Sequence, residues 1–448
     1  MIELTLGEVA ALVGGNLSHA APETVITGIS TDTRTIRPGD LFCPLIAARD
    51  GHDFIPDARA AGAAAVLSSR EGLHGAAVYV SDTFEALQAI AAEVRQRSGA
   101  KVAALTGSVG KTTTKEMTAA VLSQAFRTKK TEANLNNTLG VPLTLLTLTK
   151  DTQAAVVEMG MNHFGEISAC TRTALPDLGI ITNIGTAHIE FLGSREGIAK
   201  AKLELCEGMA AGSPILLNGD EPLLRDRPET ADLRPVFFGI EGPDCGLRAE
   251  DIRITDEGTA FTVRFPGGSI PVQLSDAGRH FVYDALAAFG AGLEFGMEPE
   301  QIVRGLEQFR SGRQQIRVES GYTIIDDCYN ANPESMAAAL EVLAARKTTG
   351  RRIAVLGDML ELGDHAAEAH RALGVKAAET ADAVFLYGEQ CANALQSAGG
   401  VARLFKTHGE LAAALSRYAA PGDLLLFKGS RGMRMEKALE LFLDAVDH

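Results

Sequence analysis

Residues 102–114 read V-A-A-L-T-G-S-V-G-K-T-T-T, an apolar strand that turns through glycines into a helix beginning near Lys111. Small residues in such a turn let backbone N–H groups converge on anionic oxygens, and the helix start adds the positive end of its dipole. Lys111 could then reach the phosphates of a nucleotide, and the Thr112 hydroxyl could bind Mg²⁺. The full P-loop pattern requires glycine at position 105, where the chain has Leu105. The sequence favours a nucleotide site, and the alternative is a tight turn with an exposed lysine.

Apolar strands alternate with helical segments along the rest of the chain, and polar residues follow each strand. The predicted strands lie at 154–157, 178–181 and 214–217, and again at 322–325, 353–356, 384–387 and 424–427. This alternation predicts parallel sheets with right-handed crossovers, in which ligands collect beyond the carboxyl ends of the strands. Residues 261–265 and 270–274 flank Pro-Gly-Gly-Ser and predict an antiparallel hairpin beside the parallel core.

A length of 448 residues and a hydrophobic content of 46% are typical of a globular protein of several domains. We predict an α/β chain of three domains. Residues 1–82 form a small α/β domain with a helix at 55–65. Residues 83–311 form a central domain that begins with a helix at 84–97 and holds a doubly wound, mainly parallel sheet with the P-loop-like ATPase site. Residues 312–448 form a smaller Rossmann-like domain.

The composition limits the partners and the compartment. A formal net charge of −15 argues against nucleic acid or an anionic membrane as partner, although local positive groups can still bind anionic small molecules. No apolar run approaches the roughly 18 residues of a membrane span. The N-terminus carries no basic region ahead of an apolar stretch, so we expect no secretory signal. Six scattered cysteines indicate reduced thiols, and we expect a cytoplasmic monomer.

Several polar residues at strand ends are candidates for binding or chemistry in the central domain. Glu158 ends a predicted strand near the glycine turn, where a carboxylate could share a Mg²⁺ with Thr112. His188 follows the next strand, and a histidine there is more often structural than a ligand. Lys200 and Lys202 lie in a helical segment whose default is a solvated face. The asparagines Asn134, Asn136 and Asn137 suit either a turn or contacts to a polar substrate.

Two strand ends in the third domain carry further candidates. The segment 326–333, Asp-Asp-Cys-Tyr-Asn-Ala-Asn-Pro, places two adjacent carboxylates after a buried strand, where a bound partner could relieve their repulsion. Lys428 and Arg431 flank Gly-Ser after the last strand, a cationic turn that would suit a carboxylate or a phosphate. The alternative for this turn is a basic loop on an acidic protein.

Taken together, these motifs resemble the Mur ligase family of ATP-dependent amide-forming enzymes in peptidoglycan precursor synthesis. The matching segments, in chain order, are 106–113, 136–142, 158–160, 165–167, 182–188, 199–202 and 278–280. The family's own phosphate loop lacks the outer glycine as well, so Leu105 becomes a family trait. Segments 326–333, 357–363 and 428–431 are similar to the branch that adds D-alanyl-D-alanine. The resemblance covers residues 30–436.

The resemblance implies a reaction that joins D-alanyl-D-alanine to UDP-N-acetylmuramoyl-tripeptide while ATP becomes ADP and phosphate. The peptide carboxylate would attack the γ-phosphorus to give an acyl phosphate, and the dipeptide amine would then attack the carbonyl. Such a scheme depends on positioning and charge neutralisation. The alternatives are a ligase that adds a single amino acid, a folylpolyglutamate-type ligase, and a nucleotide-switch module that forms no bond.

The resemblance also assigns roles to individual residues. It implies catalytic roles for Lys111, Lys202 and His188. It implies two Mg²⁺ ions held by Thr112, Glu158, His188 and Lys202, with Lys202 carbamylated by CO₂. Nucleotide contacts are implied for Gly107, Ser108, Val109, Gly110, Lys111, Thr112, Thr113, Asn137, His280, Arg313, Asp327, Tyr329 and Asn330. Substrate contacts are implied for Ser30, Asp32, Thr33 and Arg34 at the UDP-sugar end and for Lys428 and Arg431 in the third domain, which must close over the site.

Two positions depart from the family pattern. Asp284 stands where the family usually has asparagine, and an aspartate cannot donate to an adenine nitrogen as an amide does. Cys328 replaces a more usual serine. We do not expect it to act as a nucleophile, because Asp326 and Asp327 would raise its pKa.

Overall fold

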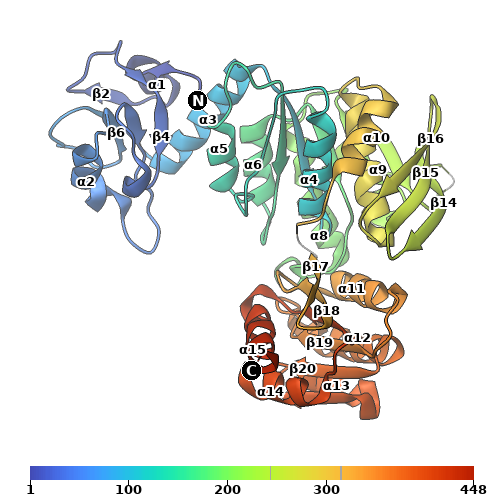
Figure 1. Cartoon of the computed structure of the whole chain (residues 1–448). Coiled ribbons are helices and arrows are strands. Elements are labelled where there is room, and N and C mark those ends of the chain that lie inside the picture. Colours follow the sequence, from blue (N-terminus) through green and yellow to red (C-terminus); the bar gives the residue numbers. More distant parts are fainter. Residues whose placement is uncertain (243, 313–314, 448) are drawn as a thin grey trace.

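The computed structural model describes residues 1–242, 244–312 and 315–447, which form three lobes (Figure 1). The strands of the three larger sheets lie within residues 16–79, 101–274 and 315–428. The prediction of a mixed α/β chain with a central, mainly parallel sheet is confirmed. Within the described residues, no helix has both the length and the apolar character needed to cross a membrane.

The N-terminal lobe holds a five-stranded sheet in the order β2-β7-β6-β5-β4, and a separate antiparallel pair, β1 and β3. The strands are β1 (Leu4–Thr5), β2 (Asn16–Ser18), β3 (Val25–Ile26), β4 (Gly28–Ser30), β5 (Asp40–Phe42), β6 (Ala65–Ser68) and β7 (Ala77–Tyr79), and the helices are α1 (Leu6–Leu12) and α2 (Ile55–Ala60). The predicted helix at 55–65 is wrong beyond Ala60. Gly62 adopts a φ of +102°, which ends the helical path, and β6 begins at Ala65.

The central lobe is built on a nine-stranded sheet in the order β16-β15-β14-β13-β12-β11-β8-β10-β9. Its parallel part comprises β8 (Lys101–Thr106), β9 (Thr128–Lys130), β10 (Ala154–Glu158), β11 (Leu178–Ile181), β12 (Pro214–Asn218), β13 (Arg234–Gly239) and β14 (Leu247–Thr255). The predicted hairpin is present as β15 (Gly258–Phe265) and β16 (Gly268–Leu274), and β15 also pairs antiparallel with β14.

Helices cover both faces of this sheet. One layer contains α3 (Thr83–Ser98), α5 (Gly140–Leu145) and α6 (Glu166–Ala174), and the other contains α4 (Lys111–Leu122), α9 (Arg279–Glu294) and α10 (Pro299–Gln308). Because successive side chains of a strand point to opposite faces, Val102 and Ala104 join the first layer's core while Ala103 and Leu105 join the second. Two short helices, α7 (Ile189–Leu192) and α8 (Arg195–Leu203), follow β11.

The C-terminal lobe has a six-stranded sheet in the order β17-β18-β22-β19-β20-β21, parallel except for the edge strand β17. Its strands are β17 (Gln315–Glu319), β18 (Tyr322–Asp327), β19 (Arg352–Gly357), β20 (Ala383–Tyr387), β21 (Ala402–Phe405) and β22 (Leu424–Lys428). Its helices are α11 (Pro333–Ala345), α12 (Ala366–Thr380), α13 (Cys391–Ala398), α14 (His408–Tyr418) and α15 (Glu436–Val446). In Figure 1 this lobe lies below the central lobe, with α11 on the side that faces it.

Candidate active site

The turn between β8 and α4 has the geometry of a phosphate loop. Gly110 adopts φ +80° directly before Lys111, the first residue of α4. A Cβ at Gly107 would lie 1.8 Å from Oγ1 of Thr182, so only glycine fits at that position. The Nζ of Lys111 donates to the carbonyl oxygens of Gly107 at 2.7 Å and Ser108 at 3.3 Å. The ammonium therefore lies over a loop of backbone groups at a helix N-terminus, an arrangement suited to anionic oxygens.

A buried carboxylate lies beside the first turn of α4. Glu158, at the end of β10, is 2% exposed, and its two carboxylate oxygens accept from Oγ1 of Thr112 at 2.9 Å and from Nδ2 of Asn136 at 2.8 Å. The Nζ of Lys115 lies 3.9 Å from the same carboxylate. The structure thus brings Thr112 and Glu158 together and adds Asn136, giving the set of oxygen donors that a hard cation such as Mg²⁺ prefers.

The segment after β11 packs against the phosphate loop. Oδ1 of Asn183 accepts from the backbone N–H groups of Ser108 at 3.2 Å and Val109 at 2.9 Å. Oγ1 of Thr182 donates to the carbonyl of Val109 at 2.7 Å, and the N–H of Gly185 donates to Oγ of Ser108 at 2.8 Å. These bonds hold the two loops together at neighbouring carboxyl ends of the sheet.

Both Lys200 and Lys202 were expected on a solvated face of α8. Lys200 is exposed there, whereas Lys202 is buried, with 2% of its surface exposed. Among the described residues, the side chain of Lys202 has no hydrogen bond or ion pair, and Lys111 is its charged neighbour. Burial, with a smaller contribution from Lys111, lowers the pKa of Lys202 well below the usual value of a lysine. The environment therefore favours a neutral amine at this position.

His188 lies at the start of α7 with φ +65°, and its partner comes from the C-terminal lobe. Its Nδ1 is 2.6 Å from Oε2 of Glu361. This contact lowers the pKa of the Glu361 carboxyl. The pairing leaves Nε2 of His188 as the ring nitrogen available to a ligand, the arrangement common in metal-binding histidines.

The C-terminal lobe contributes a second wall of polar groups. Asp327 ends β18 and Lys428 ends the neighbouring strand β22, and these residues pair in the parallel register. Nζ of Lys428 lies 2.8 Å from Oδ2 of Asp327 and donates to the carbonyl of Asn330 at 2.8 Å. Arg431 extends outward and pairs with Glu436 at 3.0 Å. Adjacent strand ends thus hold a buried lysine between a carboxylate and a loop carbonyl.

A cleft of about 810 Å³ separates this wall from the phosphate loop. Of the predicted site residues, Ser108, Val109, Gly110, Lys111, Thr112, Thr113, His280, Asp327, Tyr329, Asn330 and Lys428 line it. Gly107, Glu158, His188, Lys202, Asn137 and Arg431 are not part of the lining, nor is the N-terminal segment 30–34. Arg313 lies outside the described residues. The side chain of Asn137 accepts from the N–H groups of Leu139 and Gly140, so it caps the start of α5.

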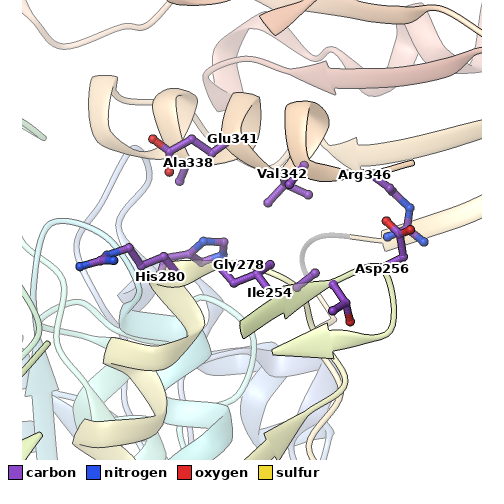
Figure 2. A pocket seen from close by; sticks show the side chains of 12 residues that line it. Ile254, Asp256, Gly278, His280, Ala338, Glu341, Val342 and Arg346 are labelled. Carbon is purple, nitrogen blue, oxygen red and sulfur yellow. The ribbon is translucent and has the colours of Figure 1, made fainter. Parts of the chain in front are cut away.

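His280, near the start of α9, also borders a smaller cavity of about 140 Å³ between the lobes. Figure 2 shows Gly278 and His280 across this cavity from Ala338, Glu341 and Val342 of α11. Burial and, secondarily, the nearby Lys428 lower the pKa of His280 to about 4. The imidazole is therefore neutral near pH 7 and can offer one donor and one acceptor to a ligand.

Comparison with known proteins agrees with this geometry. Family models described as Mur ligase family catalytic domain, Mur ligase middle domain, and Mur ligase glutamate ligase domain match residues 25–108, 105–292 and 312–431. The chain belongs to the Mur ligase family. It is 39% identical to the UDP-N-acetylmuramoyl-tripeptide--D-alanyl-D-alanine ligase of Bacillus subtilis, over 99% of both chains, and 38% identical to that of Escherichia coli, over 98% of both.

Solved structures support the same membership. A structure of MurF from Acinetobacter baumannii is 33% identical, with a TM-score of 0.93 over 99% of both chains. MurF ligase from Thermotoga maritima in complex with ADP is 28% identical, with a TM-score of 0.85 over 94% of this chain and 98% of that one. The similarity to both structures includes all three lobes.

In this Mur ligase, Asp284 lies beneath the phosphate loop. Its Oδ1 accepts from Oγ1 of Thr114 at 2.8 Å, and a Cβ at Gly110 would lie 2.5 Å from the same oxygen. Its Oδ2 is buried and has no hydrogen-bond partner among the described residues. Burial raises the pKa of Asp284 to about 7. The hydrogen bond from the Thr114 hydroxyl acts in the opposite direction and offsets only part of this rise. The carboxyl thus supports the loop from below.

Of the substrate residues predicted in the N-terminal lobe, Ser30 ends β4 and residues 32–34 follow it, at the edge where the carboxyl ends of β4, β5 and β6 meet. Asp32 accepts from Nε and a terminal nitrogen of Arg34, and this contact lowers the pKa of Asp32 to about 2. Oγ of Ser30 bonds to Oγ1 of Thr35 at 2.9 Å and donates to the carbonyl of Asp32 at 2.8 Å. These bonds shape an exposed loop at the end of the sheet, the place where ligands of parallel sheets bind.

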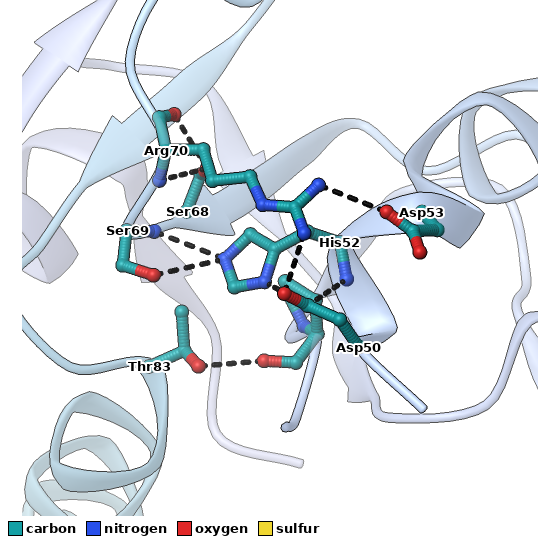
Figure 3. A network of polar contacts seen from close by, with 8 residues as sticks. Asp50, His52, Asp53, Ser68, Ser69, Arg70 and Thr83 are labelled. Carbon is teal, nitrogen blue, oxygen red and sulfur yellow. Dashed lines mark hydrogen bonds and ion pairs between the residues drawn. The ribbon is translucent and has the colours of Figure 1, made fainter. Parts of the chain in front are cut away.

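A polar network that the sequence did not predict lies on the same edge (Figure 3). His52, 4% exposed, shares a proton with Oδ1 of Asp50 at 2.7 Å through Nδ1, and its Nε2 accepts from the N–H of Ser69 at 3.1 Å. Arg70 pairs with Asp50 and with Asp53. The bonds between the two segments join residues 17 or 20 positions apart, so no local pattern could indicate the network.

The buried thiols of the C-terminal lobe are not activated. Burial, and to a lesser degree Asp326, raises the pKa of the Cys328 thiol, which agrees with the expectation that it is no nucleophile. Cys391 lies near Asp358 and His370, three residue types that bind metals. However, Nδ1 of His370 bonds to the carbonyl of Ala366 and Nε2 accepts from the N–H of Met359. Both ring nitrogens are engaged, so this cluster is a structural network.

Proposed function

We propose that this chain is an ATP-dependent ligase that joins D-alanyl-D-alanine to UDP-N-acetylmuramoyl-tripeptide through an acyl phosphate. The observation that carries the proposal is the cleft, in which a phosphate loop faces the polar wall formed by Asp327, Asn330 and Lys428. Curated relatives at 38–39% identity over the full length, named for this reaction, support the same substrates.

The first step activates a carboxylate. A carboxylate oxygen of the tripeptide attacks the γ-phosphorus of ATP, the bond from the γ-phosphorus to the bridging oxygen breaks, and ADP leaves. Lys111 offsets the charge on the moving phosphoryl group, and the N–H groups of residues 110–112 at the start of α4 orient the remaining phosphates. The protein's contribution is alignment and charge neutralisation, because no side chain forms a covalent bond in this step.

The second step forms the amide. The dipeptide amine attacks the acyl carbon to give a tetrahedral intermediate, and inorganic phosphate leaves as the amine loses its proton. Lys428 lines the C-terminal wall and Arg431 follows it on the same turn, and we place the dipeptide carboxylate at this positively charged turn. Tyr329 and Asn330 border the same part of the cleft, and we place them and His280 beside the nucleotide.

Two Mg²⁺ ions fit the donor groups of the central lobe. Thr112 and Glu158 would hold one ion, and His188 with a carbamylated Lys202 would hold the other. Bound Mg²⁺ supplies charge neutralisation for the phosphates and the reacting oxygens. The burial of Lys202 without a partner supports carbamylation, because a neutral amine reacts with CO₂ and the product is an anionic oxygen ligand.

We assign each part of the chain a task. Residues 1–82 hold the UDP-sugar end through Ser30, Asp32, Thr33 and Arg34; residues 83–311 hold ATP; and residues 312–448 hold the dipeptide. We further propose a cytoplasmic monomer with no nucleic acid partner, which the net charge of −15 and the six free thiols support.

The deciding experiment measures ADP release with UDP-N-acetylmuramoyl-tripeptide, ATP and a panel of acceptors. We expect release to depend on D-alanyl-D-alanine, with an amide product that contains it. Dependence on a single amino acid instead would contradict the proposal. Nucleotide binding without an amide product under any mixture would indicate a switch module.

A further inference from the structure

Residues 185 and 186 lie between the phosphate loop and the C-terminal lobe and contact both. On one side, the N–H of Gly185 donates to Oγ of Ser108 at 2.8 Å. On the other, Thr186 donates to the carboxylate of Glu334, from its N–H at 2.9 Å and from Oγ1 at 3.1 and 3.2 Å. Glu334 is the second residue of α11, so three donor contacts to one charged acceptor join the two lobes.

The glycine at position 185 is explained by this contact. A Cβ built there would lie 2.7 Å from Cδ of Glu334 and 2.9 Å from each carboxylate oxygen. The backbone φ of Gly185 is not in the left-handed region, so conformation alone does not require glycine. The absence of a side chain instead lets the Glu334 carboxylate reach the backbone of the segment.

A second acidic residue of the C-terminal lobe contacts the far end of the same segment. Glu361 pairs with Nδ1 of His188 at 2.6 Å, and its carbonyl accepts from the N–H of Glu190 at 3.4 Å. The C-terminal lobe therefore contacts residues 185–190 at two points, through Glu334 at Thr186 and through Glu361 at His188 and Glu190. Glu334 contacts Thr186, the residue directly after Gly185, whose N–H bonds to Ser108 in the phosphate loop.

We propose that Glu334 is a positioning residue that couples docking of the C-terminal lobe to the conformation of the phosphate loop, and thereby to nucleotide affinity. With the lobe docked, Glu334 fixes residues 185 and 186 so that the Gly185 N–H stays on Ser108. When the lobe moves away, that constraint is lost. Because coupling between two equilibria is reciprocal, bound nucleotide should also favour the docked lobe. The inference rests on the proposed function in taking ATP as the ligand of the loop.

The test is the affinity of the full chain for a non-hydrolysable ATP analogue with Mg²⁺, measured by calorimetry. We expect Glu334→Ala to weaken binding by about fivefold or more. Glu334→Gln, which keeps the shape and one acceptor oxygen, should weaken it less. The matched control is Glu379→Ala, an exposed carboxylate on α12 of the same lobe, which should bind like the wild type. Unchanged affinity in Glu334→Ala would overturn the proposal, as would tighter binding in Glu334→Gln, which would indicate simple charge repulsion.

A double-mutant cycle separates coupling from a general loss of structure. Thr186→Val removes the hydroxyl donor from the central lobe, and we expect the double variant with Glu334→Ala to bind no more weakly than Glu334→Ala alone. Multiplied losses in the double variant would overturn the proposal. Melting curves establish that each variant is folded. Because the analogue forms no amide, this result is independent of the acceptor panel, so either proposal can fail while the other stands.

Discussion

At the scale of single residues, burial decides the charge of the groups around the phosphate loop. Lys202 and Asp284 are both nearly inaccessible, and removal from water disfavours the ionised form of each. The pKa of the lysine therefore falls and that of the aspartate rises. Both shifts favour the uncharged forms, so burial reduces the charge that these two side chains bring to the nucleotide site.

The raised pKa of Asp284, about 7, makes its contribution to stability depend on pH. Between pH 4 and 7 the folded state keeps a proton that the unfolded state has lost, so the free energy of unfolding falls as pH rises through this window. The asparagine in Asp284→Asn is always neutral, so this variant should not show the fall in the free energy of unfolding that Asp284 causes as pH rises. We expect it to be more stable than the wild type by an amount that grows from pH 4 to 7 and then levels off, on the order of 2–4 kcal/mol.

Urea unfolding at several pH values measures this difference. The control is Asp444→Asn, an exposed aspartate on α15, whose difference from the wild type should stay flat with pH. Parallel pH profiles for Asp284→Asn and the wild type would show that Asp284 is ionised in the folded protein.

Carbamylation of Lys202 is testable against a neighbour on the same helix. After incubation with ¹³C-labelled bicarbonate, we expect a carbamate signal in the ¹³C NMR spectrum of the wild type, because burial lowers the pKa of the Lys202 amine and so raises its neutral, reactive fraction. The signal should disappear in Lys202→Arg and persist in Lys200→Arg, whose side chain is exposed. A signal that survives in Lys202→Arg would place the modification elsewhere.

The sequence predicted the phosphate loop and its neighbours because strand ends and glycine turns are local patterns. Thr112 and Glu158 could be paired in advance, since strands of one parallel sheet end at one edge. The contact of Asn136 with Glu158 could not be predicted, because it depends on cross-strand register. The contacts of Glu334 with Thr186 could not be predicted either, because they depend on the docking of two lobes. A single sequence shows neither the register between distant strands nor the way in which two lobes dock.

At the scale of elements, the strands were predicted more accurately than the helix boundaries. Apolar runs such as 154–157 and 178–181 have the length and the polar ends of buried parallel strands, and the structure contains them. The helix at 55–65 was overextended because alanine favours helix, whereas Gly62 turns the chain. The edge strand β17 went unpredicted, since its polar alternation is weak and its pairing is tertiary.

Close packing of α10 on α4 supports the element that carries the phosphate loop. A Cβ at Gly305 would lie 2.5 Å from Cα of Val121 and 2.9 Å from the carbonyl of Ala120. Gly305→Ala should therefore force the two helices apart and lower the free energy of unfolding by about 1–3 kcal/mol. Denaturant unfolding checks this. The control is Gly409→Ala on α14, where no heavy atom lies within 4 Å and alanine should be neutral or stabilising by up to about 1 kcal/mol. Equal changes in the free energy of unfolding in the two variants would mean that α10 can move away from α4 without loss of stability.

At the scale of the whole molecule, the proposed substrates meet residues from all three lobes. The UDP-sugar residues 30–34 lie in a lobe that does not line the cleft, while the cleft itself is formed by the central and C-terminal lobes. Within the described residues, polar contacts between the central and C-terminal lobes include Thr186 with Glu334, His188 with Glu361, and the N–H of Lys347 with Asp256 at 3.0 Å. Such an interface can change its relative orientation at modest energetic cost.

Binding of nucleotide and UDP-substrate together should therefore bring the lobes closer. A ligand that touches two lobes stabilises the arrangement in which it makes both sets of contacts, and the population shifts by its differential affinity. We expect a smaller radius of gyration in small-angle scattering when a non-hydrolysable ATP analogue and UDP-N-acetylmuramoyl-tripeptide are both saturating, and a lesser change with either alone. Glu379→Ala should contract like the wild type, whereas Glu334→Ala should contract less, because it lacks one of the contacts that hold the C-terminal lobe. An unchanged radius at saturation in the wild type would mean that the site is already assembled in the free protein.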